Sequence, residues 1–312
     1  MTDQEHLWER RVITKLAQAS LKEQKRARRW SIFFKFLVFA YITFILFMFT
    51  EPDISKAKIS QKHTALVELQ GTIADGETAS ADNIISALKS AFEDEKTVGV
   101  ILRINSPGGT PVQAGYIYDE ILRLREKYPE KPLYAVVSDM AASGGYYVAS
   151  AADEIYVSNS SIVGSIGVRM DGFGVVDAME KLGIESRTLT AGENKALLDP
   201  FTPVNEEARK HLQNMIDEIH QQFIDAVKKG RGDRLKEFEG LFSGLIWTGQ
   251  EAIKFGLVDN IGSASYVARE VIGAEDIVEY TVEEDVLKRL ADRLGATTAK
   301  VLNKEVFSPK LY

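Results

Sequence analysis

Residues 139–147 read Asp-Met-Ala-Ala-Ser-Gly-Gly-Tyr-Tyr, and this stretch decides the fold of the chain. It follows an apolar run at 133–137, which predicts a buried strand, and it leads into a short predicted helix at 146–152. A further strand is predicted at 154–157. A strand, a sharp turn of small residues and a helix together place Ser143 at the first turn of that helix, where backbone N–H groups are unpaired.

Ser143 has two interpretations in this position. Serine is a favoured N-cap residue, so its hydroxyl could serve only to cap the helix. A serine so placed could instead attack a carbonyl carbon, while the amide of Gly144 stabilises the oxyanion that forms. The stretch alone leaves both interpretations open.

A second glycine-rich turn follows an apolar strand predicted at 98–104 and reads Asn-Ser-Pro-Gly-Gly over 105–109. Pro107 has no N–H for the strand ladder and therefore ends the strand. Gly108 and Gly109 let the backbone approach a ligand closely, because they carry no Cβ. Two strands that both open into glycine-rich turns predict a cleft at the carboxyl edge of a parallel sheet.

The bulk composition is that of a globular protein. The chain has 312 residues, of which 45% are hydrophobic and 27% charged, so it can bury a sizeable core. Its net charge of -7 gives no argument for nucleic-acid binding. It contains no cysteine, which excludes disulfides, a cysteine nucleophile and thiolate metal sites.

The N-terminal part of the chain predicts a membrane anchor. Residues 1–30 are polar and basic, whereas residues 31–50 are almost wholly apolar. About 20 apolar residues are what a helix needs to cross a bilayer, and a buried core helix of that length would have a polar face. Lys35 is the one charge and lies near the basic end, where its amine can reach the headgroups.

The flanking charges predict the orientation of this anchor. Residues 11–30 hold seven Lys and Arg, and residues 51–70 hold three. By the positive-inside rule the N-terminus stays in the cytoplasm, and everything after residue 50 is exported. The apolar run exceeds the 7–15 residues usual for a cleaved signal peptide, so it predicts an uncleaved signal anchor.

The remaining periodicities predict one α/β domain at 64–275, after a linker at 51–63 and before a helical tail at 276–312. The predicted elements of this part are a strand at 64–69, a helix capped by Asp82, a helix at 112–127, a short helix at 177–182, a strand at 186–189, a long helix capped by Asn205, a helix opened by a capping box at Thr248, and a tail helix at 286–302.

A serine nucleophile needs a base, and the residues alone leave its identity open. His6 is predicted on the cytoplasmic side, His63 in the linker, and His211 and His220 on a solvated helix face. Lys195, in a turn-like stretch followed by apolar residues, is the alternative. A lysine ordinarily titrates near 10.4, and burial against apolar groups lowers that value. An ordinary exposed loop lysine is the competing interpretation.

Taken together, Ser-Pro-Gly-Gly at 106–109 and Ala-Ala-Ser-Gly-Gly at 141–145 resemble the serine peptidases of the Clp/crotonase fold. The closer resemblance is to the signal peptide peptidase A (protease IV) family, over roughly residues 64–270. It implies an α/β fold of repeated β-β-α units, preceded here by one transmembrane helix. It also implies a Ser/Lys dyad in which Ser143 is the nucleophile and Lys195, about fifty residues later, is the base.

The resemblance assigns supporting roles as well. Gly109 and Gly144 would supply the oxyanion-hole amides, Gly108 would shape the turn, and Ser165 would hold the lysine amine. The reaction implied is peptide hydrolysis through an acyl-enzyme, with no metal or other cofactor. Clp proteases use Ser-His-Asp instead, so the match to that branch is the weaker one.

The resemblance further implies a ring-like homo-oligomer, such as an octamer, in which the serine and the lysine meet across a subunit boundary. It would stand on the outer face of a bacterial inner membrane, with the catalytic domain in the periplasm. The expected substrates are hydrophobic peptides, above all remnant signal peptides left in the bilayer. Two alternatives are a catalytically silent membrane scaffold of the same fold and a crotonase-like acyl-transfer enzyme.

Overall fold

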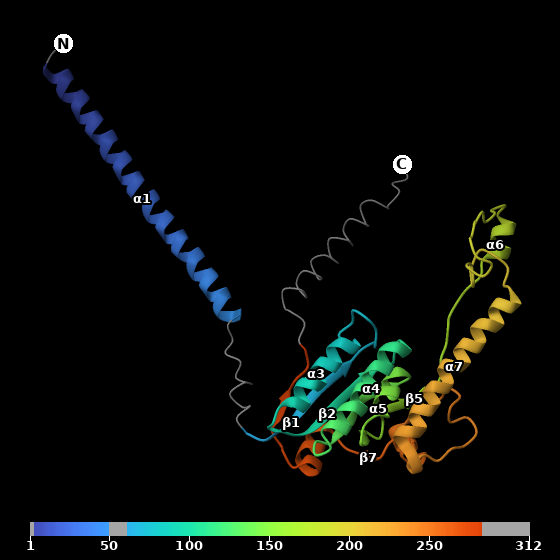
Figure 1. Ribbon diagram of the computed structural model, residues 1–312. Coiled ribbons are helices and arrows are strands. Elements are labelled where there is room, and N and C mark those ends of the chain that lie inside the picture. The colour runs from blue at the N-terminus through green and yellow to red at the C-terminus, as the bar shows by residue number, and fades with distance from the viewer. Residues whose placement is uncertain (1–2, 50–60, 283–312) are drawn as a thin grey trace. The chain divides into compact units, whose positions relative to one another are not determined.

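The computed structural model describes residues 3–49 and 61–282 (Figure 1). The chain divides into two units, Met1–Lys58 and Ile59–Tyr312. Helix α1, Asp3–Phe49, makes up the described part of the first unit. Among the described residues, none of the helices combines the length and the apolar character needed to cross a bilayer. The last part of the predicted span, 45–50, lies outside the residues whose side chains are described.

The second unit is built on an eight-stranded sheet. Its strands are β1 His63–Gln70, β2 Thr97–Ser106, β3 Leu133–Ala142, β4 Glu154–Val157, β5 Ile162–Gly164, β6 Ile246–Thr248, β7 Asn260–Ile261 and β8 Ile277–Glu279. The main path runs β6-β5-β3-β2-β1-β8, and β4 pairs with β3 and β7. The described strand pairs are parallel apart from β5 with β6, so the predicted α/β class is confirmed.

Helices cover both faces of this sheet. They are α3 Ala81–Glu93, α4 Pro111–Lys127, α5 Gly144–Ala149, α6 Val176–Lys181, α7 Glu206–Arg231, α8 Gly249–Lys254 and α9 Ala264–Tyr266, with a 3-10 turn η1 Gly232–Arg234 and a π-helical segment η2 Val267–Ile272. Helices α3 and α4 lie side by side over β1 and β2 (Figure 1). Successive residues of a strand point to opposite faces, so Ala65 and Val67 join the core under α3 and α4, whereas Leu66 packs against α9 and η2.

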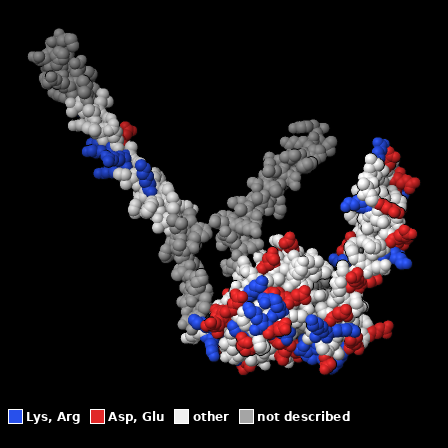
Figure 2. All heavy atoms as spheres, viewed as in Figure 1, with Lys and Arg blue, Asp and Glu red and all other residues white. Residues whose placement is uncertain are grey.

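Charged side chains of both signs lie on the face of the second unit that Figure 2 shows. On the face shown in Figure 2, Lys and Arg are interspersed with Asp and Glu over the described residues, while basic side chains gather on the middle of α1. This face of the second unit therefore carries mixed charge rather than a single basic patch.

The predicted elements around the two glycine-rich turns are confirmed, with shifted ends. Strand β3 continues to Ala142, five residues past its predicted end at 137, so Ser143 follows the strand directly. The N-cap of α3 is Ser80, and Asp82 lies in the first turn. The strand predicted at 186–189 is wrong, because those described residues form an irregular segment.

Both predicted domain boundaries need correction. His63 is the buried first residue of β1 and not part of the linker, and its Nε2 lies 2.9 Å from the Tyr280 hydroxyl. Strand β8 pairs with β1 through Thr64 and Ile277, so the sheet extends beyond the predicted end of the domain at 275. The tail helix predicted at 286–302 lies outside the described residues.

Helix α7 begins as predicted, since the Asn205 side chain accepts hydrogen bonds from the amides of Glu207 and Ala208. Its C-terminal half packs into the core through Phe223 and Val227. Its N-terminal half runs away from the sheet toward α6 (Figure 1). Residues 170–205, here called the arm, lie beside that end and expose eight large apolar side chains: Met170, Phe173, Leu182, Ile184, Leu189, Leu198, Phe201 and Val204.

Candidate active site

Ser143 stands between β3 and α5 with backbone angles that few non-glycine residues adopt, φ 52° and ψ -123°. Its amide donates to the Gly164 carbonyl at 2.9 Å, and its carbonyl accepts from the Tyr147 amide at 2.9 Å, so the fold holds this conformation. The side chain makes no cap hydrogen bond to α5. Capping therefore does not explain this serine, and backbone strain of this kind clusters at functional sites.

Ser143 opens into a cleft of about 730 Å³ at the carboxyl ends of the strands. The lining residues are Thr72, Pro107, Gly108, Gly109, Pro111, Ala114, Ser143, Gly144, Tyr147, Ser165, Gly167, Val168, Arg169, Ile219, Gln222, Phe223, Ser243 and Gly244. The structure thus brings Ser143 together with the four residues to which the family resemblance gave supporting roles: Gly108, Gly109, Gly144 and Ser165. Like Ser143, Ser165 has a positive φ, of 52°.

The Gly108 turn packs directly against the Ser143 turn. Gly108 has a φ of +106°, and a Cβ built on it would lie 2.7 Å from the Ser143 Cβ and 2.8 Å from the Gly144 nitrogen. Both the backbone angle and the lack of space require glycine here. The turn is therefore a fixed wall beside the serine.

Two backbone amides in the cleft have no partner. Within residues 61–282, neither the Gly109 N–H nor the Gly144 N–H donates a hydrogen bond to another described group. The Ser143 hydroxyl likewise makes no hydrogen bond there. A free hydroxyl beside two unpaired N–H donors is the arrangement that stabilises the oxyanion in acyl transfer.

The rings of Tyr147 and Phe223 form one wall of the cleft, and the buried ring of Tyr118 packs against Tyr147 from outside the cleft lining. The ring centroid of Tyr147 lies 4.9 Å from that of Phe223 and 5.1 Å from that of Tyr118. Burial raises the pKa of the Tyr147 phenol, and it raises the pKa of Tyr118 to about 12. Both phenols are therefore neutral at physiological pH, and the wall is uncharged.

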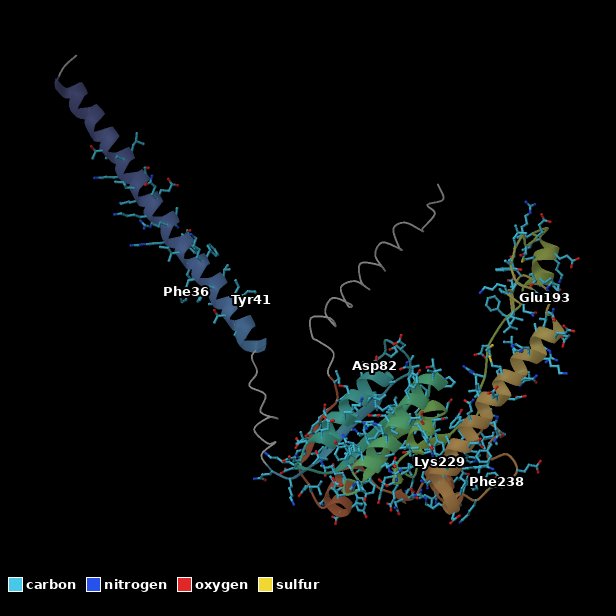
Figure 3. All side chains as sticks on the ribbon, viewed as in Figure 1. Phe36, Tyr41, Asp82, Glu193, Lys229 and Phe238 are labelled. Atoms are coloured by element: carbon cyan, nitrogen blue, oxygen red, sulfur yellow. The ribbon has the colours of Figure 1, made fainter. Side chains whose placement is uncertain are left out.

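The described residues that line the cleft of one chain include no candidate base for the serine. Among the described residues that line it there is no histidine, lysine, aspartate or glutamate. Arg169 lines it but is paired with Asp171 at 3.4 Å. Lys195 lies on an exposed turn of the arm and does not line the cleft. In Figure 3, Glu193, two residues before Lys195, is labelled beside the N-terminal end of α7, whereas Lys229 marks the opposite end of that helix.

The described histidines do not reach the cleft either. His220 is half-buried, with its Nε2 3.1 Å from the Ile166 carbonyl oxygen, so its predicted place on a solvated face is wrong. His211 is exposed. His63 lies at the amino end of β1, whereas Ser143 follows the carboxyl end of β3, so the two lie at opposite edges of the parallel sheet.

Several cleft residues escaped the sequence analysis. Thr72 follows β1 at Gly71, and the rule that predicted the other two turns, a parallel strand ending in glycine, would have found it. Phe223 and Ile219 come from α7, far along the chain from the two turns, and their helical spacing is typical of ordinary core packing, so it gave no sign of the cleft.

Comparison with known proteins gives consistent matches. The sequence model of peptidase family S49 matches residues 125–277, which include Ser143, Ser165 and Lys195. A protein of Synechocystis assigned as a protease is 32% identical over 255 residues, which cover 76% of this chain and 90% of that protein. A protein of Enterococcus faecium assigned as signal peptide peptidase SppA is 30% identical over 233 residues, covering 72% of this chain and 67% of that protein.

A longer relative matches as well. A Brucella abortus protein named Na(+)/H(+) antiporter NhaA is 41% identical over 236 residues, which are 72% of this chain and 32% of that protein. The chain therefore spans about a third of the length of this relative, and the likeness concerns that third alone.

Proposed function

Because the chain belongs to peptidase family S49, we propose that it is a membrane-anchored serine endopeptidase that hydrolyses peptide bonds through an acyl-enzyme on Ser143. The observation that carries the proposal is the strained serine, whose uncapped hydroxyl shares a cleft with the unpaired amides of Gly109 and Gly144. The parallel strands β1, β2 and β3, joined through α3 and α4, support the Clp/crotonase-like class of fold.

The proposed reaction follows from these groups. Ser143 Oγ forms a bond to the substrate carbonyl carbon as a base takes its proton, and the carbonyl oxygen becomes an oxyanion held by the Gly109 and Gly144 N–H groups. The C–N bond then breaks, and the amine leaves with the proton from the base. Water, deprotonated by the same base, hydrolyses the ester and restores the Ser143 hydroxyl.

We assign the base to Lys195 of a second copy of the chain. The cleft of one copy lacks a base among its described residues, and Lys195 stands on an arm that exposes eight large apolar side chains. Packing this arm against a neighbour would bury those side chains and remove water from the amine, which favours the neutral form that a base requires. Ser165, in the same cleft as Ser143, would accept or donate a hydrogen bond to that amine. The functional unit is then a closed homo-oligomer, such as an octameric ring, with shared active sites.

The proposed substrates are hydrophobic peptides, including remnant signal peptides. The uncharged wall of Tyr147 and Phe223, together with Ile219 and Ala114, suits apolar side chains. The name of the Enterococcus faecium relative supports the same substrate class. The apolar residues 31–50 would anchor the chain in a bacterial inner membrane, with the peptidase domain on the outer side.

The test of the nucleophile uses the full chain and a fluorophosphonate reagent. Peptide mass mapping should find the adduct on Ser143, and casein cleavage should stop as the adduct forms. Ser143→Ala should lose both, whereas Ser186→Ala, which removes an exposed hydroxyl of the arm, should lose neither. A chain that cleaves casein with Ser143 unlabelled has another nucleophile. A folded oligomer that neither labels nor cleaves is the silent scaffold.

The test of the anchor is separate. In bacterial cells the chain should resist extraction with alkaline carbonate, and protease added to spheroplasts should digest the domain after residue 61. Release by carbonate, or protection from the added protease, would contradict the anchor or its orientation.

A further inference from the structure

Ser106, the last residue of β2, is a buried side chain that the proposed reaction does not use. Its hydroxyl, on a residue 0% exposed, donates to the Gly71 carbonyl at 2.6 Å and accepts from the Gly108 amide at 3.1 Å. The Gly108 carbonyl lies farther away, at 3.5 Å, so the hydroxyl proton goes to Gly71. One side chain thus ties the turn after β1 to the turn after β2.

Backbone hydrogen bonds join the same two turns. The Ile73 amide donates to the Gly108 carbonyl at 2.9 Å, and the Thr110 amide donates to the Ile73 carbonyl at 2.8 Å. In a trans peptide group the C=O and the N–H point in opposite directions. Because the Gly108 carbonyl is turned toward Ile73, the N–H of Gly109 points the other way, and Gly109 lines the cleft.

The turn at residues 106–109 packs tightly against the Ser143 turn. A Cβ on Gly108 would lie 2.7 Å from the Ser143 Cβ, and a Cβ on Gly145 would lie 3.0 Å from the Ser106 carbonyl oxygen. A shift of residues 106–109 therefore changes the distance between the Gly109 N–H and the Ser143 hydroxyl.

We propose that Ser106 is a positioning residue for peptide hydrolysis: by bridging Gly71 and Gly108 it holds the Gly109 N–H where the oxyanion forms. The inference rests on the proposed function, because it gives the Gly109 amide a role in that reaction. Ser106 contacts no reacting atom and acts through Gly108 and Gly109 alone.

The test compares Ser106→Ala with Ser161→Ala in the full-length oligomer. Ser161 is 2% exposed, its hydroxyl donates to the Ser138 carbonyl at 2.7 Å and accepts from the Ser158 amide at 3.0 Å, and it does not line the cleft. Each variant removes one buried hydroxyl and its donated and accepted hydrogen bonds, so the two should lose similar stability. Catalysis, by contrast, should separate them.

Three quantities are measured after titration of competent sites with the fluorophosphonate: kcat per titrated site, KM for a peptide substrate, and the inhibition constant of a peptide aldehyde. The aldehyde forms a hemiacetal with Ser143 whose oxygen occupies the oxyanion site. For Ser106→Ala we expect kcat per site to fall about 10- to 100-fold, KM to stay within about twofold, and the aldehyde constant to rise with the fall in kcat. For Ser161→Ala all three should stay near the wild-type values.

A Ser106→Ala chain with wild-type kcat per site overturns the proposal, and so does an equal loss in Ser161→Ala. Hydrogen exchange supplies a readout that needs no catalysis: the Gly108 amide should exchange at least about tenfold faster in Ser106→Ala only. An unchanged exchange rate of the Gly108 amide in Ser106→Ala would show that the Ser106 hydroxyl does not hold this turn in place. A folded wild-type chain that neither reacts with the fluorophosphonate nor cleaves peptide refutes the proposed function, and with it the role of Ser106 in catalysis. The exchange rate of the Gly108 amide would still show whether the Ser106 hydroxyl holds the two turns together.

Discussion

The buried guanidinium of Arg231 grips the carboxylate of Asp259 with two parallel hydrogen bonds, of 2.8 and 2.7 Å. The same carboxylate accepts from the Ile155 amide at 2.7 Å. The pair thereby fastens the C-terminal end of α7 to strand β4 of the sheet. Earlier residues of the same helix, Ile219, Gln222 and Phe223, line the cleft.

The Asp259 pair should make the domain sensitive to acid. Burial alone would raise the pKa of Asp259, but the hydrogen bond and charge of Arg231 outweigh it and hold that pKa below its usual 3.8. Because the folded pKa is the lower one, the stabilisation is complete above about pH 4 and is lost as the pH falls through the folded pKa. Asp259→Asn should cost about 3–5 kcal/mol at pH 7, since it leaves a buried charge unpaired. Urea unfolding should show this gap at pH 7 and a smaller one at pH 3, and equal gaps would contradict the assignment.

Gly108→Ala should abolish peptide hydrolysis. The added methyl would lie 2.7 Å from the Ser143 Cβ and 2.8 Å from the Gly144 nitrogen, so the nucleophile or the oxyanion donor must move. Gly76→Ala is the matched control, because Gly76 also has a positive φ, of +77°, but nothing lies within 4 Å of its Cβ position. Gly76→Ala should lose about 1 kcal/mol of stability through its backbone angle alone, and Gly108→Ala should lose more, because the clash adds to the same strain. Under conditions in which both variants are folded, only Gly108→Ala should lose casein cleavage. Full activity of Gly108→Ala would show that the turn is not a fixed wall.

Ser143→Gly should be more stable than Ser143→Ala. The angles φ 52° and ψ -123° suit glycine, and the relief of strain should exceed glycine's larger unfolded-state entropy by about 1 kcal/mol. The melting temperature should therefore be about 2–4 °C higher for the glycine variant. At Ser150, with φ -64° and ψ -16°, the order should reverse, because alanine is favoured in a helical conformation. The same order at both positions would exclude strain at Ser143.

Lys195→Ala should lower the rate of casein cleavage by about 10²–10⁴-fold, the usual contribution of a general base. Lys195→Arg should not restore it, because a guanidinium keeps its proton in proteins. Lys181→Ala removes another positive charge from the arm and should leave the rate unchanged. If the Lys195→Ala chain cleaves casein at the wild-type rate, Lys195 is not the base, and a histidine takes that role.

Co-expressed Ser143→Ala and Lys195→Ala chains should regain activity together. Each site would need a serine from one copy and a lysine from its neighbour, so random mixing in a ring should restore about a quarter of the wild-type sites. Mixing Ser143→Ala with the double variant should restore none. If mass spectrometry verifies mixed oligomers and casein remains uncut, the sites are not shared.

The parts of the site that lie at strand ends could be predicted from the sequence. Ser143, Gly108 and Gly109 each follow an apolar strand within a few residues, and the carboxyl ends of parallel strands meet at one edge of the sheet. Local chemistry also sufficed at Asn205 and Thr248, whose side chains cap α7 and α8 as predicted.

Relationships between distant parts of the chain could not be predicted. Strand β8 has three residues, too few for a periodicity, and its place beside β1 depends on pairing across the whole domain. The burial of His63 depends on that same neighbourhood, through Tyr280. Lys195 lies outside the cleft because of the course of the whole arm, and its neighbours in the sequence give no information about that course.

Lys195 lies outside the cleft of its own chain, and this has a consequence for when the chain can be active. If the base comes from a neighbouring copy, as proposed, a copy that has not yet assembled has no group among the described residues of its cleft that could deprotonate Ser143. Specific activity should therefore climb with protein concentration and fade on dilution. Such a peptidase would be kept inactive before assembly without a propeptide or an inhibitor. A high local concentration of the chain would activate it, and a low concentration would keep it from cleaving other proteins.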